Sequence, residues 1–445
     1  MVSDSQQTSI GPFYGLLPEL AWSPVGDRLA VYGEAEGYGI WVWEKETGRV
    51  QRLVQLLDRS GQGATTVTFV GWDPAGKALY YAIDGVQPAG PHLGERGVAV
   101  HRVGLDRSDT EVAFLPGGAA LIRTHQFNAA TGWLLVHRGN DLWRVNVENG
   151  RVIHLKDNLP TWDGLFGVTP SPTGETVAYP ETRPGQHGLV LLNVVTGVER
   201  NVGRPDEYAF APVWSPDGEK LAFLSAEARG ETFDFQLGED GPLPPATRLV
   251  LVTKAGEPLA VWTPPQGEKA GAPAWSLDGG RVAFLSAALS PQPDGGEAVR
   301  WRRLLVGVPG RSLTDWGSVQ GEWVTVAGFA PDGRILVYRY EASGGVSILA
   351  YGLEPGQVEK YIDNAVDEPP TWWEGNLLTA RLEAGAQETL NTQIYRRQPG
   401  GKTIRLTTGP GWKSRFSLAG SLLAFLNADN QAAPYPIMVG IRSLP

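Results

Sequence analysis

The sequence predicts an all-β fold, a closed β-propeller built from four-stranded antiparallel blades. Three observations support this prediction. A motif of the form Trp-Ser-Pro-Asp-Gly recurs along the chain. The 57 Gly and 34 Pro residues are spread evenly, as in a protein with many tight turns. No segment shows an apolar period of 3.6 residues over the length of a helix.

The best copy of the motif runs from Trp214 to Phe223. Pro216 presets φ at the second position of a turn, Asp217 suits the third, and Gly218 suits the fourth. An apolar strand end precedes the turn and an alternating strand follows it. We therefore expect a hairpin in which Trp214 lies on the buried side.

Nine related anchors divide the chain into repeats, and their glycines are 42 to 61 residues apart. The short steps match a four-stranded propeller blade, and the long ones contain loop insertions. We expect one domain over residues 1–445 with nine blades. Eight blades remain the alternative, because the third and fourth anchors are degenerate and one repeat could be an insertion. The anchors start at Trp22, Trp72, Phe127, Thr169, Trp214, Trp275, Phe329, Trp372 and Phe416.

Each repeat supplies four strands in the same order. In the fifth repeat the second strand is predicted at Leu221–Ser225 and the third at Arg248–Val252. The last repeat has too few residues for a fourth strand after Pro436–Ile441. We expect Gln7–Tyr14 to supply that strand and close the ring, which removes the exposed sheet edges.

The stretch Trp-Ser-Pro-Asp-Gly-x-x-Leu-Ala-Phe, with x-Gly turns between third and fourth strands, resembles the TolB-like repeat of bacterial propellers. This is the PD-type relative of the WD repeat. The resemblance covers nearly the whole chain and implies the fold. Propellers of this kind serve as protein-binding platforms, as domains of peptidases and occasionally as lyases, so the resemblance does not choose a function.

The amino-acid composition excludes some classes of partner and of chemistry. The net charge is −10 and no basic run stands out, so nucleic acid is not an expected partner. The absence of Cys excludes disulfides and thiolate chemistry. No apolar stretch is long enough to cross a membrane. The polar N-terminal residues lack a signal-peptide core, so we expect an extracytoplasmic protein if a leader was removed and a cytoplasmic one otherwise.

Loop insertions are predicted between second and third strands at Gly85–Gly97, Glu227–Thr247 and Ala287–Ala298. They would project from the face that also carries the connections between blades, and loops on rigid scaffolds often carry function. The second insertion contains Phe233 and Phe235 among acidic residues, which favours a partner-binding loop. The alternative is a tolerated, solvated insertion.

Tryptophan gives the candidate contact residues. The anchor tryptophans are expected in the core between blades. Others fall in predicted connections between blades, where a Trp beside a carboxylate can stack on a sugar or anchor a protein contact. The alternative is that they fill the seams between blades. The predicted contact set is Trp162, Asp163, Asp315, Trp316, Trp373 and Trp412, together with Phe233 and Phe235.

Signals for catalysis are weaker, and we assign no catalytic residue. His125, next to Gln126, is a weak metal candidate near the central funnel, resembling the His and Gln ligands of metal-dependent oligogalacturonate lyases. The acidic stretch Asp363–Glu368 could hold Ca²⁺ through oxygen ligands or be a solvated loop. No cofactor is expected otherwise.

The sequence therefore favours a non-catalytic binding propeller that engages a protein or a glycan. The alternative is a carbohydrate-active enzyme, a metal-assisted lyase or a glycoside hydrolase, that uses the funnel. A structural subunit of an envelope assembly is a third hypothesis.

Overall fold

The described residues of the computed structural model are all-β and contain no helix. They form two compact units, Met1–Asp157 with Thr371–Pro445 (unit 1) and Asn158–Pro370 (unit 2), which we describe separately. The described ranges are 7–14, 17–35, 37–56, 66–117, 122–159, 167–181, 188–227, 248–291, 297–319, 324–340, 346–366, 368–383, 391–428 and 436–444.

Unit 1 contains antiparallel four-stranded sheets, and three of them follow chain order. They are β2 (Glu19–Trp22), β3 (Arg28–Glu34), β4 (Tyr38–Glu44) and β5 (Val50–Leu56); β6 (Thr66–Trp72), β7 (Ala78–Val86), β8 (Arg96–Gly104) and β9 (Asp109–Pro116); and β10 (Ile122–Asn128), β11 (Trp133–Arg138), β12 (Asp141–Asn146) and β13 (Val152–Lys156). The others are β31 (Thr371–Trp373), β32 (Asn376–Leu382), β33 (Thr392–Arg397) and β34 (Thr403–Arg405); and β35 (Trp412–Ala419), β36 (Leu422–Ala428), β37 (Ile437–Ser443) and β1 (Gln7–Phe13).

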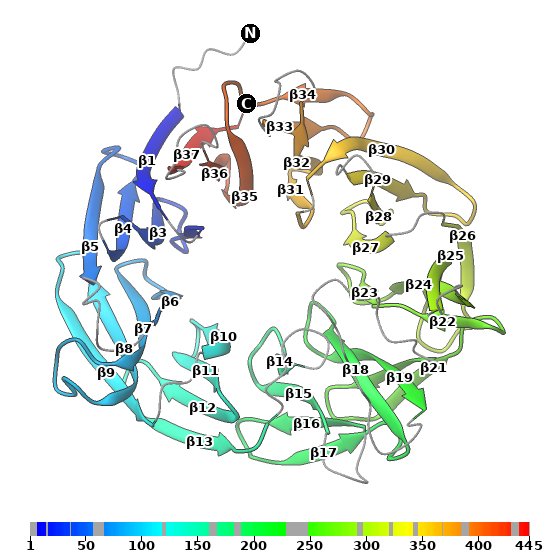
Figure 1. The fold of residues 1–445 in the computed structure, drawn as a ribbon, viewed down its shortest axis with the longest axis horizontal. Helices are drawn as coiled ribbons and strands as arrows, with labels where there is room; N and C mark the ends of the chain where they lie inside the picture. The colour runs from blue at the N-terminus through cyan, green and yellow to red at the C-terminus, as the bar shows by residue number, and fades with distance from the viewer. Residues whose placement is uncertain are drawn as a thin grey trace. The chain divides into compact units, whose positions relative to one another are not determined.

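Unit 2 repeats the same arrangement (Figure 1). Its sheets are β14 (Thr169–Pro170), β15 (Thr176–Pro180), β16 (Leu189–Asn193) and β17 (Glu199–Val202); β18 (Glu207–Trp214), β19 (Lys220–Glu227), β20 (Arg248–Thr253) and β21 (Pro258–Trp262); β22 (Glu268–Ala270) and β23 (Ala274–Trp275), both paired with β24 (Val282–Pro291), then β25 (Glu297–Gly307) and β26 (Thr314–Ser318); and β27 (Val324–Phe329), β28 (Ile335–Tyr340), β29 (Val346–Tyr351) and β30 (Val358–Ala365).

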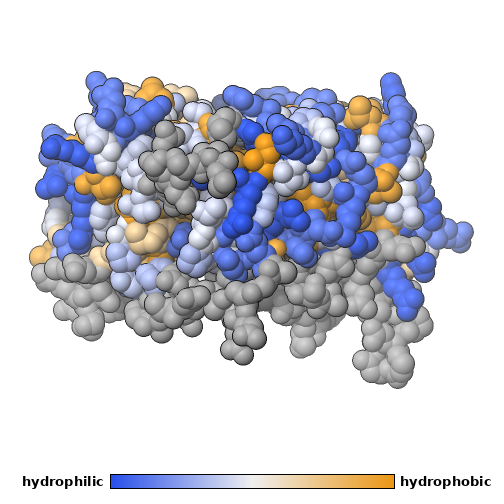
Figure 2. All heavy atoms as spheres, turned by 90° about the horizontal axis from the view of Figure 1, so that it is seen from above, coloured by the Kyte–Doolittle hydropathy of each residue, from blue (hydrophilic) through white to orange (hydrophobic). Residues whose placement is uncertain are grey.

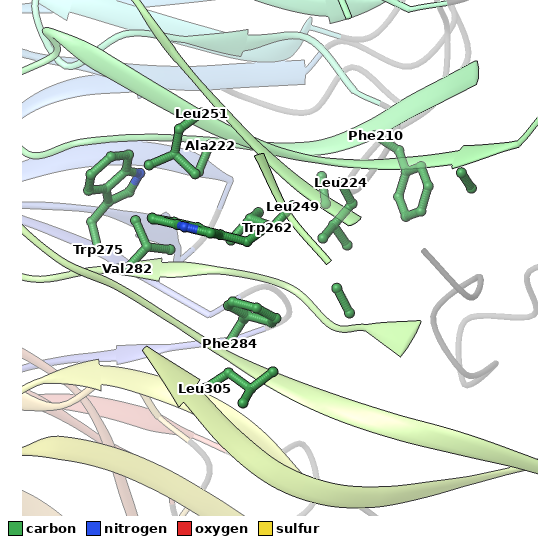
Figure 3. Close-up of a cluster of buried hydrophobic side chains, with 13 residues drawn as sticks. Phe210, Ala222, Leu224, Leu249, Leu251, Trp262, Trp275, Val282, Phe284 and Leu305 are labelled. Carbon is green, nitrogen blue, oxygen red and sulfur yellow. The ribbon is translucent and has the colours of Figure 1, made fainter. Parts of the chain in front are cut away.

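Within each unit, consecutive sheets pack face to face, and this supports a β-propeller fold. Between the β18–β21 and β22–β26 sheets, Phe210, Leu224 and Trp262 meet Trp275 and Phe284 in one buried cluster (Figure 3). Similar clusters join the β2–β5 sheet to the β6–β9 sheet, and the β6–β9 sheet to the β10–β13 sheet. Apolar residues alternate along the strands, so each sheet can bury both faces.

Three of the anchor tryptophans connect neighbouring sheets through hydrogen bonds. Trp22, by contrast, is only partly buried, and its Nε1 has no hydrogen-bond partner within the described residues. Trp72 Nε1 donates to the carbonyl of Ala21 at 3.0 Å, and Trp275 Nε1 donates to the carbonyl of Val213 at 2.9 Å. Trp214 Nε1 donates in the same way to Thr169 at 3.0 Å. For Trp72 and Trp275 the acceptor directly precedes the anchor tryptophan of the preceding sheet, and for Trp214 it is Thr169, the first residue of the preceding anchor. The expectation that these three tryptophans are core residues is confirmed, since all are buried.

Each sheet has a turn end and a loop end. The turn end carries the turns from first to second and from third to fourth strand, and the loop end carries the remaining connections. At the turn end, Ser215 Oγ donates to Asp217 Oδ1 at 2.6 Å, and the Glu219 N–H donates to the same oxygen at 3.0 Å. Lys220 Nζ then reaches the Gly279 carbonyl of the next turn at 3.0 Å. These contacts tie successive turns together.

The two terminal segments pair as expected. Strand β1 pairs antiparallel with β37 and is the fourth strand of the sheet that contains β35 and β36. Ile10 and Phe13 are buried in a cluster with residues of β3 and β37. The N-terminal strand is therefore part of the core of unit 1.

One predicted insertion is instead mostly a hairpin, so that expectation was wrong. Strands β24 and β25 extend through Pro291 and from Glu297, and Ala287 pairs with Trp301 in the added part. Only residues 292–296 of the predicted Ala287–Ala298 loop lie outside the described part of the chain. Cross-strand pairing explains the difference, because both arms of the insertion have strand-compatible sequences.

On the face shown in Figure 2, apolar residues are scattered among polar ones. Several of the most exposed ones lie in turns at the turn end, including Val25 at 69% and Leu277 at 58%. Single exposed apolar residues are ordinary on a folded protein, so they do not by themselves mark a site.

Candidate functional site

Several predicted site residues cannot be placed. Trp162, Asp163, Phe233 and Phe235 lie outside the described residues. The backbone of His125 lies in β10, the first strand of its sheet, but its side chain is outside the described part. The binding and metal hypotheses for these five residues therefore remain predictions.

Trp316 was expected in a connection between blades, and this placement was wrong. It lies in β26, the fourth strand of its sheet, and is 9% exposed. Its Nε1 donates to the Gly352 carbonyl at 2.9 Å, in the same way that Trp262 Nε1 donates to the Arg311 carbonyl at 3.0 Å. Trp316 therefore fills a seam between sheets, which was the alternative interpretation.

Trp373 is also a core residue. It lies in β31 and packs with Leu378, Ile394 and Phe425 at 9% exposure. Its neighbour Trp372, the predicted anchor, is only partly buried. Successive side chains of a strand point to opposite faces, so one of the two must face the core, and it is Trp373.

Asp315 is exposed in β26 and held in a fixed position. Its Oδ2 accepts from Arg303 Nη1 at 2.8 Å, and its Oδ1 accepts from the Gly317 N–H at 3.0 Å. Arg303 also contacts Glu268 Oε1 through Nη2 at 2.9 Å. Hydrogen bonds to both carboxylates raise the pKa of the Arg303 guanidinium, which stays charged.

Trp412 is the member of the predicted set that stands as a partly exposed tryptophan in the described structure. It is the first residue of β35, opposite Ala428 of β36, at the loop end of its sheet. A tryptophan in this position offers a rigid ring at low entropic cost.

The residue after Trp412 is a buried lysine. Lys413 is 2% exposed. Its ammonium donates to the carbonyls of Gly409 at 3.1 Å, Pro410 at 3.0 Å and Gly411 at 3.4 Å. These three carbonyls belong to the connection that leads into β35. The lysine therefore ties this connection to the strand that carries Trp412.

A polar cluster formed by two residues of β33 and by Thr407, which follows β34, supports the same segment. Thr392 Oγ1 accepts from the Lys413 N–H at 2.5 Å and donates to the Lys413 carbonyl at 3.1 Å. Thr407 Oγ1 donates to Gln393 Oε1 at 2.9 Å, and Gln393 Nε2 donates to the Gly409 carbonyl. Thr392, Gln393 and Thr407 are each at most 1% exposed. Buried networks with satisfied groups are rigid.

Electrostatics sets the charge of Lys413. Its pKa is lowered to about 8, mainly by burial and then by the positive charge of Arg405, while Glu383 acts in the opposite direction. Glu383 is itself paired with Arg405 at 3.2 Å and accepts from the Tyr395 hydroxyl at 2.7 Å. The Lys413 amine can therefore lose its proton at mildly alkaline pH.

The sequence motifs did not reveal two ionic clusters at the loop end of unit 2, one around the buried Glu207 and one around the partly buried Glu268. In the first, Glu207 accepts from Ser225 and Arg248. In the second, Glu268 Oε2 accepts from Ser286 Oγ at 2.5 Å and from Arg303 Nε at 3.1 Å. The members lie on the first, second and third strands of each sheet. The sequence offered only a Ser on the second strand and an Arg on the third strand of each sheet, separated by an insertion of different length.

The acidic stretch Asp363–Glu368 is not the loop that was expected. Asp363 lies within β30, where Ser347 Oγ donates to its Oδ1 at 3.1 Å and Lys360 forms an ion pair with it. The Glu368 carbonyl accepts from the Tyr338 hydroxyl, and Asp367 lies outside the described residues. Among the described residues, no group of three or more His, Asp or Glu could hold a metal ion.

Comparisons with known proteins identify the fold alone. No family model and no curated protein matches the chain. A crystal structure of a eukaryotic initiation factor is similar, with a TM-score of 0.52 and 12% identity over 89% of this chain and 90% of that chain. The overlay supports a shared fold and says nothing about activity.

Two other similar structures have lower TM-scores, so we draw nothing from them. An oligogalacturonate lyase in complex with manganese has a TM-score of 0.38 and 12% identity, over 99% of this chain and 91% of that chain. The Porphyromonas gingivalis dipeptidyl peptidase 4 has a TM-score of 0.47 and 12% identity, over 96% of this chain and 58% of that chain.

In the part of the chain that the structure describes, no helix could span a membrane.

Proposed function

We propose that this protein is a non-catalytic binding propeller that engages a protein or a glycan through the loop end of its sheets. One observation carries the proposal. Trp412 presents a partly exposed ring on a strand whose next residue, Lys413, is buried and held by three backbone carbonyls. A pre-positioned aromatic ring on a rigid base is the usual centre of a binding contact.

The proposal retains Trp162, Asp163, Phe233 and Phe235 as further contact candidates. It keeps Asp315 as a separate candidate away from the loop end, because Asp315 is the second residue of β26 and directly follows the turn from β25. Asp315 is exposed and fixed by Arg303 and by the Gly317 N–H. A carboxylate in a fixed position suits a sugar hydroxyl or a basic side chain. Trp316 and Trp373 are no longer candidates, because both are buried.

We also propose that the two units belong to one closed propeller of nine blades, with eight as the alternative. The nine sequence anchors and the pairing of β1 with β37 support this proposal. The TolB-like family assignment rests on the repeat motif. An experimental structure of the full chain would count the blades, and an open arrangement of sheets would contradict the proposal.

Screening on a glycan array and a peptide-display library tests the binding proposal. For the best ligand found, we expect Trp412→Ala to raise Kd about 30-fold, which corresponds to a contact worth about 2 kcal/mol. The matched control is Val25→Ala, which removes an exposed apolar side chain at the turn end of the same unit and should leave Kd unchanged. The proposal would be overturned if Trp412→Ala and the parent bound the ligand equally well, or if neither the glycan array nor the peptide-display library gave a specific ligand.

A further inference from the structure

Arg442 is a buried arginine whose charge is not balanced by a neighbour. It lies in β37, opposite Leu423 of β36, and only 8% of the residue is exposed. Within the described part of the chain, its side chain forms no hydrogen bond and no ion pair. A guanidinium keeps its proton in a folded protein, so Arg442 cannot become neutral. A buried cation without an acceptor is costly, and this position therefore calls for an anionic group.

The side chain of Arg442 faces the sheet formed by β31–β34. Residues opposite each other in an antiparallel ladder share a face, so Arg442 points to the same side as Leu423. Leu423 belongs to a buried cluster that also contains Trp373 and Ile394 of the β31–β34 sheet. Leu444, two residues after Arg442, lies in the same cluster. Arg442 therefore enters the seam between two neighbouring sheets of unit 1, which we call the Arg442 seam (Figure 1).

A second guanidinium reaches the Arg442 seam from the facing sheet. Arg396 in β33 stands over the Trp373 ring, with its Cζ 5.4 Å from the ring centroid. It follows Ile394 by two residues and so lies on the same face of β33. Arg396 and Arg442 are each the next-to-last residue of the third strand of their sheet, which places both near the turn end. Two like charges directed into one seam repel each other unless an anion lies between them.

The strands on both sides of the Arg442 seam carry only basic charges. Strands β31 to β37 and β1 contain six Arg and one Lys but no Asp or Glu. The segment 371–445 has eight Lys or Arg against four Asp or Glu, a net charge of +4 in a chain whose net charge is −10. Of the two described carboxylates in this segment, Glu383 pairs with Arg405, and Glu374 is exposed in the turn after β31. The surroundings of Arg442 therefore favour an anionic ligand.

We propose that the Arg442 seam binds an oxyanion, that is a carboxylate, phosphate or sulfate group, with Arg442 as the main contact and Arg396 as a second donor. The planar guanidinium presents a fork of N–H donors that matches two oxygens of such a group. The ligand balances the buried charge of Arg442 and offsets the repulsion between the two arginines. The site lies at the turn end of unit 1 and does not depend on the proposed binding function of the loop end.

Calorimetric titration of the full-length protein with inorganic phosphate, sulfate and acetate tests the proposal. Chloride is the background anion, and the ionic strength is held constant. We expect saturable binding of at least one of the three anions, and the one that binds most tightly identifies the group that the seam accepts. The same anion should raise the unfolding midpoint, because a ligand that binds the folded state stabilises it. Absence of saturable binding for all three anions would overturn the proposal.

Substitutions of Arg442 assign the binding to the seam. Arg442→Met removes the charge and keeps a side chain that can pack, so Kd should rise at least tenfold. Arg442→Lys keeps the charge without the fork of donors and should recover part of the loss. Without added anion, Arg442→Met should unfold at no lower temperature than the parent, because it removes an uncompensated buried charge. An unchanged Kd for Arg442→Met would contradict the proposal.

Arg397→Met is the matched control. Arg397 is the neighbour of Arg396 on β33 and points to the opposite face, where its Nη1 donates to the Gly401 carbonyl at 2.8 Å. The control should keep the Kd of the parent, whereas Arg396→Met should raise it several-fold. If Arg397→Met weakened binding as much as Arg442→Met, the anion would be responding to the general positive charge of these sheets, and the proposed site would be wrong.

Discussion

The turn end and the loop end of the sheets are stabilised in different ways. At the turn end the same contact recurs, since Trp72, Trp214 and Trp275 each donate to a backbone carbonyl of the preceding sheet. At the loop end the contacts differ more between sheets. Two sheets of unit 2 share a Glu–Ser–Arg cluster, whereas in unit 1 the buried Lys413 donates to three backbone carbonyls. The comparison indicates that the turn end maintains the fold and that the loop end can vary from sheet to sheet.

Removing one tryptophan from each end would test this comparison most strongly. Trp214→Ala should lower the free energy of unfolding by about 3–5 kcal/mol, because it leaves a cavity between two sheets. Trp412→Ala should cost less than about 1 kcal/mol, because its ring is already partly exposed. Urea unfolding followed by circular dichroism measures both values. Equal losses would show that the loop end is as important to stability as the turn end.

The buried Lys413 at the loop end should make the free energy of unfolding depend on pH in the alkaline range, which no contact described at the turn end is expected to do. Because the pKa of Lys413 is lowered to about 8 from its ordinary 10.5, the unfolded chain binds more protons between these values. Stability from this group therefore rises as pH rises from about 8 to about 10.5, by at most about 3 kcal/mol. Below pH 8 both states are protonated and this slope disappears.

Unfolding midpoints from pH 7.5 to 10 measure this effect as the difference between the parent and Lys413→Met. The variant should lack the rise, although it also leaves three carbonyls without their donor. Lys77→Met, at an exposed lysine of a turn, is the matched control and should keep the slope of the parent. If Lys413→Met kept the full slope, another group would be responsible.

Two turn-end glycines of unit 1 differ in whether a neighbouring sheet lies against them, so substituting each one tests how much the contact between turns contributes to stability. Gly26 has φ +70° and Gly48 has φ +65°, so an alanine is strained at either position. A Cβ at Gly26 would lie 3.1 Å from Ala419 Cβ of the neighbouring sheet, whereas a Cβ at Gly48 would meet nothing within 4 Å.

Gly48→Ala should therefore cost about 1 kcal/mol from backbone strain alone. Gly26→Ala should cost about 2 kcal/mol, because strain is joined by crowding between sheets. Thermal unfolding of the two variants gives the difference. A larger loss for Gly48→Ala would mean that the stacking of turns contributes little.

The regular part of the fold could be predicted because it follows from local rules. Pro216, Asp217 and Gly218 specify the turn, and the alternation after it specifies a strand whose existence does not depend on distant residues. The pairing of β1 with β37 was predicted from a strand deficit in the last repeat. These arguments needed only the count and order of elements.

The candidate site was harder to predict because burial depends on neighbours that the sequence does not reveal. Trp316 and Trp412 stand in similar contexts, yet Trp316 reaches a carbonyl of the next sheet while Trp412 remains partly exposed. Asp363 looked like part of an acidic loop but was drawn into β30 by pairing with β29. Nothing in the sequence indicated that Lys413 is buried. The carbonyls around its ammonium belong to Gly409, Pro410 and Gly411, and the path of that backbone cannot be predicted from the residue types.

The strand order of the sheet that contains β1 has a consequence for protein synthesis. Strand β1 leaves the ribosome well before its partner β37, because all the other described strands are synthesised between them. Until β37 emerges, Ile10 and Phe13 lack the apolar cluster that buries them. The nascent chain must therefore keep an unpaired apolar strand from aggregating throughout translation, and completion of unit 1 awaits the C-terminal strands.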